Sequence, residues 1–385
     1  MAKYKLGEIC EIVSGSTPKT GIAEYWDGNL KWITPAEIDD ESYIITDSAR
    51  KLTKLGVKKT GLSSFPSGTV ILSSRAPIGK VAIAGCEMYC NQGFKNLICS
   101  DRINNRYLYW FLKGNTAYLN SLGRGATFKE ISKKIVSDIE INVPEISQQL
   151  AAVDALERVS EIIRLRKNQL QKLDELIKAR FVELFGDPIS NPMNWNKRTL
   201  KEVCIKLNDG THFSPESFSM GDYKYITAKN IKASGFDFSN ITYVPEAVHR
   251  PIFERCNPEQ GDVLYIKDGA TTGIAIVNTL KEEFTLLSSV ALLKQNRNVI
   301  NGYFLAALLN NADMYSDIRN NMGGAAITRL TIAKLNAVKV IVPPLDLQNR
   351  FAAFVHQVDK SKVAVQKSLD EAQLLFDSLM QQYFG

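Results

Sequence analysis

One stretch without glycine or proline decides the fold: SQQLAAVDALERVSEIIRLRKNQLQKLDELIKARFVELF, residues 147–185. Apolar residues recur in it every seven positions, the period of a coiled-coil seam: Leu156, Ile163, Leu170, Ile177 and Leu184. A continuous helix of this length is about 57 Å long at about 1.5 Å per residue, which is more than the core of one domain needs. The sequence therefore predicts a central scaffold helix over residues 147–186.

A second stretch of the same character covers residues 345–385. Its apolar residues form two rows with seven-residue spacing: Phe351, Val358, Val365, Ala372 and Leu379 in one, and Val355, Leu369 and Phe376 in the other. Pro144 and Pro344 stand just before the two stretches, where proline ends a strand without breaking the helix that follows. Two such rods bury their seams most simply by packing on each other, as an antiparallel coiled coil.

The sequence also repeats itself, at an offset of about 193 to 199 residues. The paired segments keep the same order: LGEIC at 6–10 and LKEVC at 200–204, SGTVI at 67–71 and QGDVL at 260–264, and FG at 185–186 and 384–385. Each repeat is then one globular domain followed by one helix. We expect the globular domains at residues 1–146 and 187–344.

Each globular part mixes two kinds of local pattern. Short β-branched runs at residues 81–83 and 274–276 predict strands, and residues 107–120 predict a helix, with Gly and Pro turns between them. The predicted fold class is α+β: two mixed α/β domains separated by two long helices packed as an antiparallel coiled coil, with a pseudo-two-fold internal repeat.

Composition excludes several classes of protein. No apolar run approaches the roughly 18 residues that span a bilayer, and residues 1–5 lack the apolar core of a signal peptide, so we expect a cytoplasmic protein. The six cysteines include no C-x-x-C pair, which indicates reduced, structural thiols. The net charge of +6 is compatible with phosphate contacts but is weak evidence for them.

No catalytic constellation is visible. A methyltransferase needs a glycine-rich cofactor loop and an Asn-Pro-Pro-aromatic loop; residues 191–195, NPMNW, are only a passing likeness to the second, and a connecting loop explains them better. Acidic pairs at 39–40 and 282–283 lie on polar stretches and are expected to be solvated. The histidines are scattered: His212, His249 and His356. We therefore expect no catalytic residues and no metal site.

Several segments, in a fixed order, resemble a known family. They are VSGSTP at 13–18, YW at 25–26, WITP at 32–35, LSSRAPIG at 72–79, NQGF at 91–94, FGDP at 185–188 with Asn191-Pro192 and Trp195, and a Pro-x-x-x-Gln motif at Pro144 with Gln148 and at Pro344 with Gln348. Over essentially the whole chain, this order resembles the specificity subunits of type I restriction-modification enzymes.

The resemblance implies a function and partners. Each globular domain would be a target-recognition domain that reads one part of a split site in double-stranded DNA. The helices would set the spacing and dock two modification subunits, which carry S-adenosylmethionine and methylate adenine at N6. Restriction subunits would add an ATP- and magnesium-dependent nuclease. The chain itself would hold no cofactor, would not be an enzyme alone, and would contact no membrane.

Loops are the candidates for DNA contact, because side chains on turns reach base edges, whereas backbone N–H groups, Lys and Arg reach phosphates. The candidates in the first domain are Ser14, Ser16, Thr17, Lys19, Arg75 and Arg124, and those in the second are Asn208, Thr211, His212, Lys229, Lys267 and Arg329. For any one residue, plain turn geometry is an equally good explanation. The second domain has Ala228 at the Pro35 position and DGA at 268–270 in place of RAP at 75–77, which fits an asymmetric target.

Rival functions remain at this point. A coiled-coil tether would explain the helices but not two diverged globular copies. A methyltransferase or nuclease in its own right would need the missing motifs. The strongest rival is a recognition subunit of another kind of restriction enzyme, one that cuts beside its site.

Overall fold

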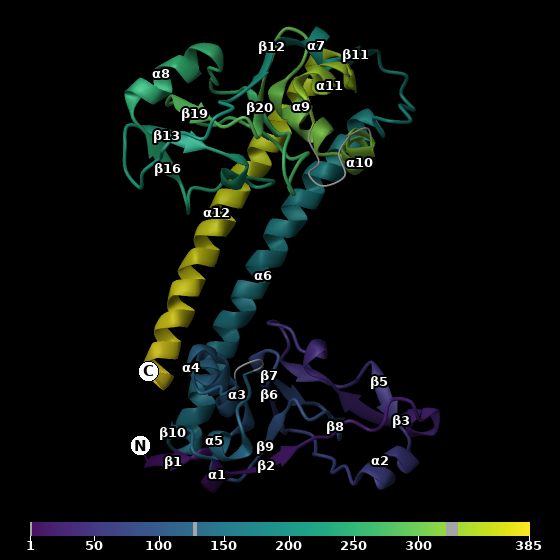
Figure 1. The fold of residues 1–385 in the computed structure, drawn as a ribbon, viewed down its shortest axis with the longest axis vertical. Coiled ribbons are helices and arrows are strands. Elements are labelled where there is room, and N and C mark those ends of the chain that lie inside the picture. Colours follow the sequence, from purple (N-terminus) through teal and green to yellow (C-terminus); the bar gives the residue numbers. More distant parts are fainter. Residues whose placement is uncertain (1, 126–128, 321–329) are drawn as a thin grey trace. The chain divides into compact units, whose positions relative to one another are not determined.

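The computed structural model describes residues 2–125, 129–320 and 330–385 (Figure 1). The chain divides into two compact units: unit 1 is Met1–Arg166 with Ser368–Gly385, and unit 2 is Lys167–Lys367. Both units mix helices and strands, which confirms the predicted class of two mixed α/β domains. Each unit contains a globular part and segments of both long helices.

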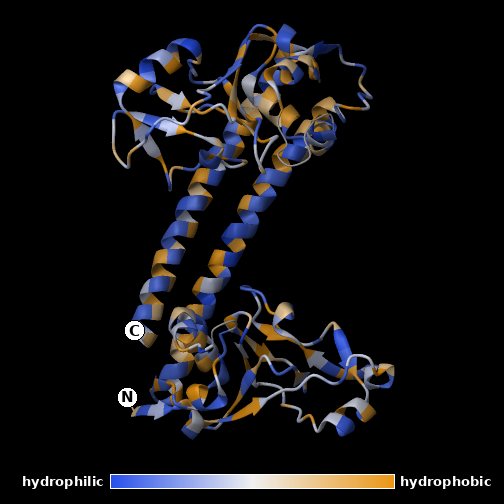
Figure 2. Cartoon of the chain, viewed as in Figure 1, coloured by the Kyte–Doolittle hydropathy of each residue, from blue (hydrophilic) through white to orange (hydrophobic). Residues whose placement is uncertain are grey.

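The two long helices lie where the glycine- and proline-free runs predict them. They are α6 (Ile146–Phe185) and α12 (Leu345–Phe384), with 40 residues each. Figure 2 shows apolar and hydrophilic residues alternating along both, as expected for amphipathic helices. Seven of the thirteen predicted seam residues are buried: Leu156, Ile163, Phe351, Val355, Val358, Val365 and Ala372. The rest are half-buried: Leu170, Ile177, Leu184, Leu369, Phe376 and Leu379.

Unit 1 contains a five-stranded sheet in the order β2-β9-β6-β7-β4 and a three-stranded sheet in the order β5-β3-β8. Its strands are β1 (Ala2–Lys5), β2 (Cys10–Ser14), β3 (Trp26–Ile33), β4 (Ile44–Ile45), β5 (Arg50–Leu52), β6 (Val70–Ser74), β7 (Ile78–Ala84), β8 (Tyr89–Cys90), β9 (Lys95–Cys99) and β10 (Glu140–Val143). Its short helices are α1 (Leu6–Ile9), η1 (Ala23–Tyr25), η2 (Pro35–Glu37), α2 (Lys54–Thr60), α3 (Asn105–Gly114), α4 (Thr116–Ser121) and α5 (Lys133–Ser137). β1 pairs with β10, and α3 and α4 pack against β7.

Unit 2 has sheets in the orders β12-β20-β17-β18 and β16-β13-β19. Its strands are β11 (Lys197–Thr199), β12 (Cys204–Asp209), β13 (Tyr223–Ile226), β14 (Ile231–Lys232), β15 (Gly235–Phe236), β16 (Thr242–Val244), β17 (Val263–Ile266), β18 (Ala275–Val277), β19 (Phe284–Leu286), β20 (Val290–Gln295) and β21 (Lys339–Ile341). Its short helices are α7 (Leu200–Val203), η3 (Ala228–Asn230), α8 (Glu246–Arg255), α9 (Gly302–Leu309), α10 (Ala312–Asn320) and α11 (Ile332–Ala337). Four strands of unit 1, β2-β9-β6-β7, thus have counterparts in the same sheet order.

The end of α12 belongs to the core of unit 1. The Phe376 ring lies 5.5 Å from that of Trp110, and the Phe384 ring lies 5.0 Å from that of Tyr107. One turn before Phe376 on the same helix, Ala372 is buried in a small cluster with Val159 and Ile163 of α6. The core of unit 1 is therefore incomplete without the last 18 residues of the chain.

The end of α6 has the same role in unit 2. Phe181 and Phe185 form an aromatic cluster with Phe304 of α9 and Phe351 of α12, with ring centroids 4.7 to 5.7 Å apart. Phe181 is 2% exposed and the other three are fully buried. Aromatic packing of this kind adds to the free energy gained from area burial alone.

A buried glutamine fastens the start of each long helix to its unit. Gln149 accepts a hydrogen bond from the Asn104 backbone N–H at 2.8 Å and donates to the carbonyls of Arg102 and Pro144 at 3.0 and 2.8 Å. Gln348 makes the matching three bonds: it accepts from the Asn301 N–H and donates to the Val299 and Pro343 carbonyls. In the first copy, therefore, the glutamine of the Pro-x-x-x-Gln motif is not the one that fastens the helix.

In that copy the fastening residue is Gln149 and not Gln148, which is exposed. The prolines whose carbonyls accept these bonds are Pro144 and Pro343, each five residues before its glutamine. In the second copy, this is the first of two consecutive prolines. A one-residue shift on a helix turns a side chain by roughly 100°, so only one of two adjacent glutamines can face the unit.

These neighbours allow a matched test. We expect Gln149→Ala to lower the free energy of unfolding by about 1–3 kcal/mol, because it leaves a half-buried N–H and two half-buried carbonyls without their partner. The change Gln148→Ala should alter it by less than about 0.5 kcal/mol, as an exposed substitution does. Urea unfolding followed by circular dichroism measures both, and equal effects would contradict the assignment.

Candidate nucleic-acid interface

The first candidate loop in unit 1 follows β2. Ser14, Ser16 and Lys19 are exposed, and Thr17 is half-buried with its hydroxyl bonded to Gln92. A Cβ on Gly15 would lie 2.0 Å from the Cys90 carbonyl oxygen, so only glycine permits this close approach of two backbone segments. The loop is thereby held against the residues 90–92.

Two buried tryptophans donate hydrogen bonds to the backbone of the same loop. Trp32 Nε1 donates to the Ser16 carbonyl at 3.1 Å, and Trp26 Nε1 donates to the Lys19 carbonyl at 3.3 Å. The two rings meet edge to face, with centroids 5.0 Å apart. The YW and WIT segments therefore support the backbone from which the loop side chains project.

Glu130 contacts two further candidates, Arg75 and Arg124. Its carboxylate lies 3.3 Å from Lys95 Nζ and 3.9 Å from Arg75 Nη1, and its backbone exchanges two hydrogen bonds with Arg124. Ser14 pairs with Lys95 across β2 and β9. Ser14, Arg75 and Arg124 thus gather at one end of the five-stranded sheet, around an ion pair whose members the sequence pattern did not single out.

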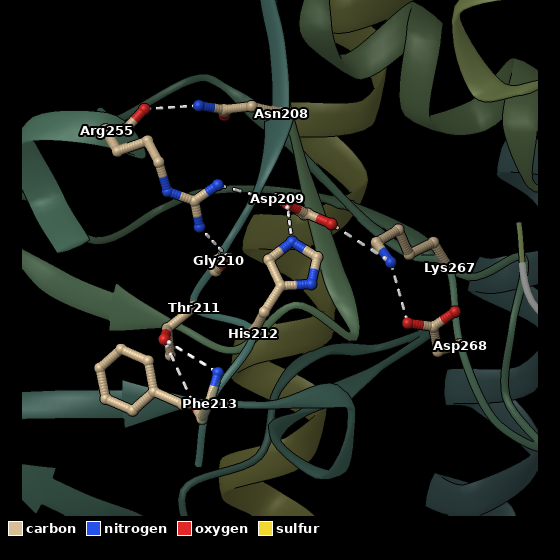
Figure 3. Close-up of polar contacts among 9 residues, drawn as sticks. All are labelled: Asn208, Asp209, Gly210, Thr211, His212, Phe213, Arg255, Lys267 and Asp268. Atoms are coloured by element: carbon tan, nitrogen blue, oxygen red, sulfur yellow. Dashed lines mark hydrogen bonds and ion pairs between the residues drawn. The ribbon is translucent and has the colours of Figure 1, made fainter. Parts of the chain in front are cut away.

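The corresponding loop of unit 2 follows β12 and is drawn in Figure 3. Asn208 donates from its amide to the Arg255 carbonyl, and His212 is exposed with Nε2 3.1 Å from Asp209 Oδ1. Thr211 is buried, and its backbone bridges to Leu287. Asp209, the partner of His212, is 4% exposed.

Lys267 lies inside this network. Its Nζ is 3.3 Å from Asp209 Oδ2 and 2.9 Å from Asp268 Oδ2, and its side chain is 8% exposed (Figure 3). Lys229, by contrast, is exposed on η3, beside Ala228, whose N–H donates to the Ser289 hydroxyl. Arg329 lies outside the described residues.

The remaining polar groups have structural roles. Glu282 and Glu283 are exposed, as expected of a solvated pair, and each also pairs with a basic side chain: Glu282 with Lys224, and Glu283 with Arg250. His249 stacks on Tyr223 with centroids 3.7 Å apart, and burial lowers its pKa. Within the described residues, no group of three or more His, Cys, Asp or Glu side chains could hold a metal ion.

The connecting loop and the cysteines also behave as structural parts. Asn191 makes two hydrogen bonds with the Trp195 backbone, and Trp195 Nε1 donates to the Phe185 carbonyl at 3.0 Å, which closes the turn after α6. All six cysteines are unpaired thiols, and burial raises the pKa of Cys90 to about 12. A thiol of this kind stays protonated and unreactive.

Comparison with known proteins places these features in a family. A family model described as the type I restriction modification DNA specificity domain matches residues 1–175 and 192–372. The MjaIX specificity subunit of Methanocaldococcus jannaschii is 27% identical over 98% of this chain and 90% of its own length. The MjaVIII specificity subunit of the same organism is 20% identical over 92% of this chain and 85% of its own.

Solved structures agree on the fold. The type I restriction-modification S subunit from M. genitalium has a TM-score of 0.61 and 16% identity, with 100% of this chain and 96% of that chain covered.

In the described part of the chain, no helix is long and apolar enough to cross a membrane. The family match covers parts of both units. The chain belongs to the type I restriction-modification DNA specificity family, and its function is to recognise DNA as the specificity subunit of such a system.

Proposed function

We propose that the chain reads a bipartite target in double-stranded DNA, with residues 1–146 reading one tract and residues 187–344 the other. The observation that carries this proposal is that each unit has a glycine-anchored loop after the matching strand, β2 or β12. The network around the loop differs between the units. In the first unit, Glu130 pairs with Lys95 and Arg75. In the second unit, Lys267 pairs with Asp209 and Asp268. This difference in the charged groups beside the loops supports the reading of two different tracts.

The helices, residues 147–186 and 345–385, would be the spacer, packed as an antiparallel coiled coil in a pseudo-two-fold repeat. Two observations support this arrangement. The start of α6 and the end of α12 belong to unit 1, whereas the end of α6 and the start of α12 belong to unit 2. The thirteen predicted seam residues are all buried or half-buried.

The candidate residues would divide into two roles. Exposed side chains would contact bases or phosphates: Ser14, Ser16, Lys19, Arg124, His212 and Lys229. Less exposed ones would fix the loops: Thr17, Arg75, Asn208, Thr211 and Lys267. Arg329 is retained as a candidate from the sequence alone.

The chain would not catalyse by itself. Two modification subunits would bring S-adenosylmethionine and transfer methyl groups to adenine N6, and restriction subunits would bring ATP- and magnesium-dependent cleavage, in the cytoplasm. Apolar side chains exposed on the long helices could supply docking area: Ile162, Leu165, Leu176, Val363 and Leu374. Exposed apolar patches commonly mark protein interaction sites.

The test compares the purified chain with its complex. We expect no methyl transfer from labelled S-adenosylmethionine to DNA by the chain alone. We expect adenine methylation once a copurified modification subunit is added, because only that subunit would hold the cofactor. Sequencing of the methylated DNA should return two short tracts whose centres lie about 10 bp apart, if both domains read the same face of the duplex. Transfer by the chain alone, or one continuous motif, would contradict the proposal.

A further inference from the structure

His212 combines exposure with a fixed orientation. Its side chain is 69% exposed, and yet Nε2 lies 3.1 Å from Oδ1 of Asp209, whose side chain is 6% exposed. Figure 3 shows the second ring nitrogen, Nδ1, turned away from Asp209. An exposed ring gains little stability from such a bond, so the arrangement instead fixes which nitrogen carries the hydrogen.

The carboxylate of Asp209 is itself held on both oxygens. Lys267 Nζ lies 3.3 Å from Oδ2, and Arg255 Nη1 lies 3.7 Å from Oδ1. Lys267 also pairs with Asp268, so the cluster contains two cations and two carboxylates and its charges balance. This balanced cluster, in which Asp209 and Lys267 are buried, keeps Asp209 in place without adding net charge to the surface.

The backbone that carries His212 is equally constrained. The Thr211 N–H donates to the Leu286 carbonyl at 2.8 Å, and the Thr211 carbonyl accepts from the Ser288 N–H at 2.8 Å. A Cβ on Gly210 would lie 1.9 Å from the Leu286 carbonyl oxygen, so the chain must have glycine there. His212 therefore projects from a segment fixed to the end of β19. Sites on a rigid support hold their geometry better than sites on loose loops.

The chemistry of the pair determines what His212 can recognise. A carboxylate only accepts hydrogen bonds, so Nε2 must donate, and in the neutral ring Nδ1 is then an acceptor. The base groups in the major groove that donate hydrogen bonds are the amino groups at N4 of cytosine and N6 of adenine. Guanine offers only acceptors there, and thymine offers an acceptor and a methyl group.

We propose that His212 reads a cytosine or adenine in the second tract by accepting a hydrogen bond at Nδ1 from the exocyclic amino group, with Asp209 as the positioning residue that fixes the tautomer. This inference rests on the proposed function of residues 187–344. It goes further by naming one base-reading atom and the class of base that it reads.

The test uses the complete methyltransferase complex and a DNA library randomised in both tracts. In the complex with His212→Ala, discrimination at one position of the second tract should fall by about tenfold, and the first tract should be read unchanged. In the complex with Asp209→Asn, an amide oxygen held by Lys267 turns the amide nitrogen toward His212. The ring then donates from Nδ1, and preference at the same position should shift to guanine or thymine.

Glu282→Gln is the control. It removes an exposed carboxylate that pairs with Lys224, outside the cluster around Asp209, and the motif should stay the same. Thermal unfolding of each variant shows whether it is folded. If Asp209→Asn does not fold, His212→Ala alone decides, because His212 is exposed. An unchanged motif with His212→Ala, or an equal loss of affinity for every sequence, would overturn the inference. If the unaltered complex returned no two-tract motif, the proposed function would fail instead.

Discussion

A chain that stops after Gly186 should form a two-fold dimer and direct methylation to an inverted repeat of the first tract. Unit 1 needs the segment Ser368–Gly385, whose Phe376 and Phe384 pack on Trp110 and Tyr107. The shortened chain lacks this segment and exposes the apolar surface beneath it. Burial of such a surface is worth about 25 cal/mol per Å², which strongly favours pairing.

The end of α6 in a second copy of the fragment can take the place of the missing segment Ser368–Gly385. In the sequence repeat, Ile177, Phe181 and Phe185 take the positions of Phe376, Met380 and Phe384. Each copy would then complete the core of the other, and a two-fold dimer with identical recognition domains reads a palindromic site.

Analytical ultracentrifugation gives the mass, and sequencing of methylated DNA gives the motif. The same fragment with Phe181→Asp and Phe185→Asp is the control, and it should remain monomeric, because two buried charges would block the packing. A monomeric fragment without these changes, or an asymmetric motif, would show that the two repeats are not equivalent modules.

Phe351→Ala should be among the most destabilising single substitutions in unit 2, at about 3–5 kcal/mol. Phe351 is fully buried and its ring lies 5.7 Å from that of Phe181 and 5.6 Å from that of Phe185. Truncation leaves a cavity where helices α6, α9 and α12 meet, and rigid helices close such a cavity poorly. Denaturant unfolding of the whole chain, followed by near-ultraviolet circular dichroism, measures the loss.

Val363→Ala, on the same helix, is the control. Val363 is 72% exposed, so its truncation should change the free energy of unfolding by less than about 0.5 kcal/mol. If both substitutions had similar effects, the aromatic cluster would not be the centre of this core.

The sequence predicted the helices well because a seven-residue spacing of apolar side chains is a local signal. It missed Phe181, which falls outside the row from Leu156 to Leu184, because that residue packs against elements far away in the chain. The internal repeat in turn predicted two units with matching strands. The spacing of apolar residues and the internal repeat therefore predicted the two long helices and the two mixed units, but not which distant side chains pack together.

The candidate site was less predictable. Lys267 has the residue type and the loop position of a phosphate contact, but its partner Asp209 lies on another strand, and only the fold brings them together. Arg75 and Arg124 were both singled out, whereas Glu130 and Lys95 between them were not. Ion-pair partners distant in sequence leave no periodic trace.

The division of the helices between the units has a consequence for synthesis on the ribosome. Domains usually fold as they emerge, the first one first. Here unit 2 has all of its residues once Lys367 is made, whereas unit 1 waits for Ser368–Gly385. The half of the protein that is translated first is therefore the half that finishes folding last, and until then Tyr107 and Trp110 lack the rings of Phe384 and Phe376 that cover them.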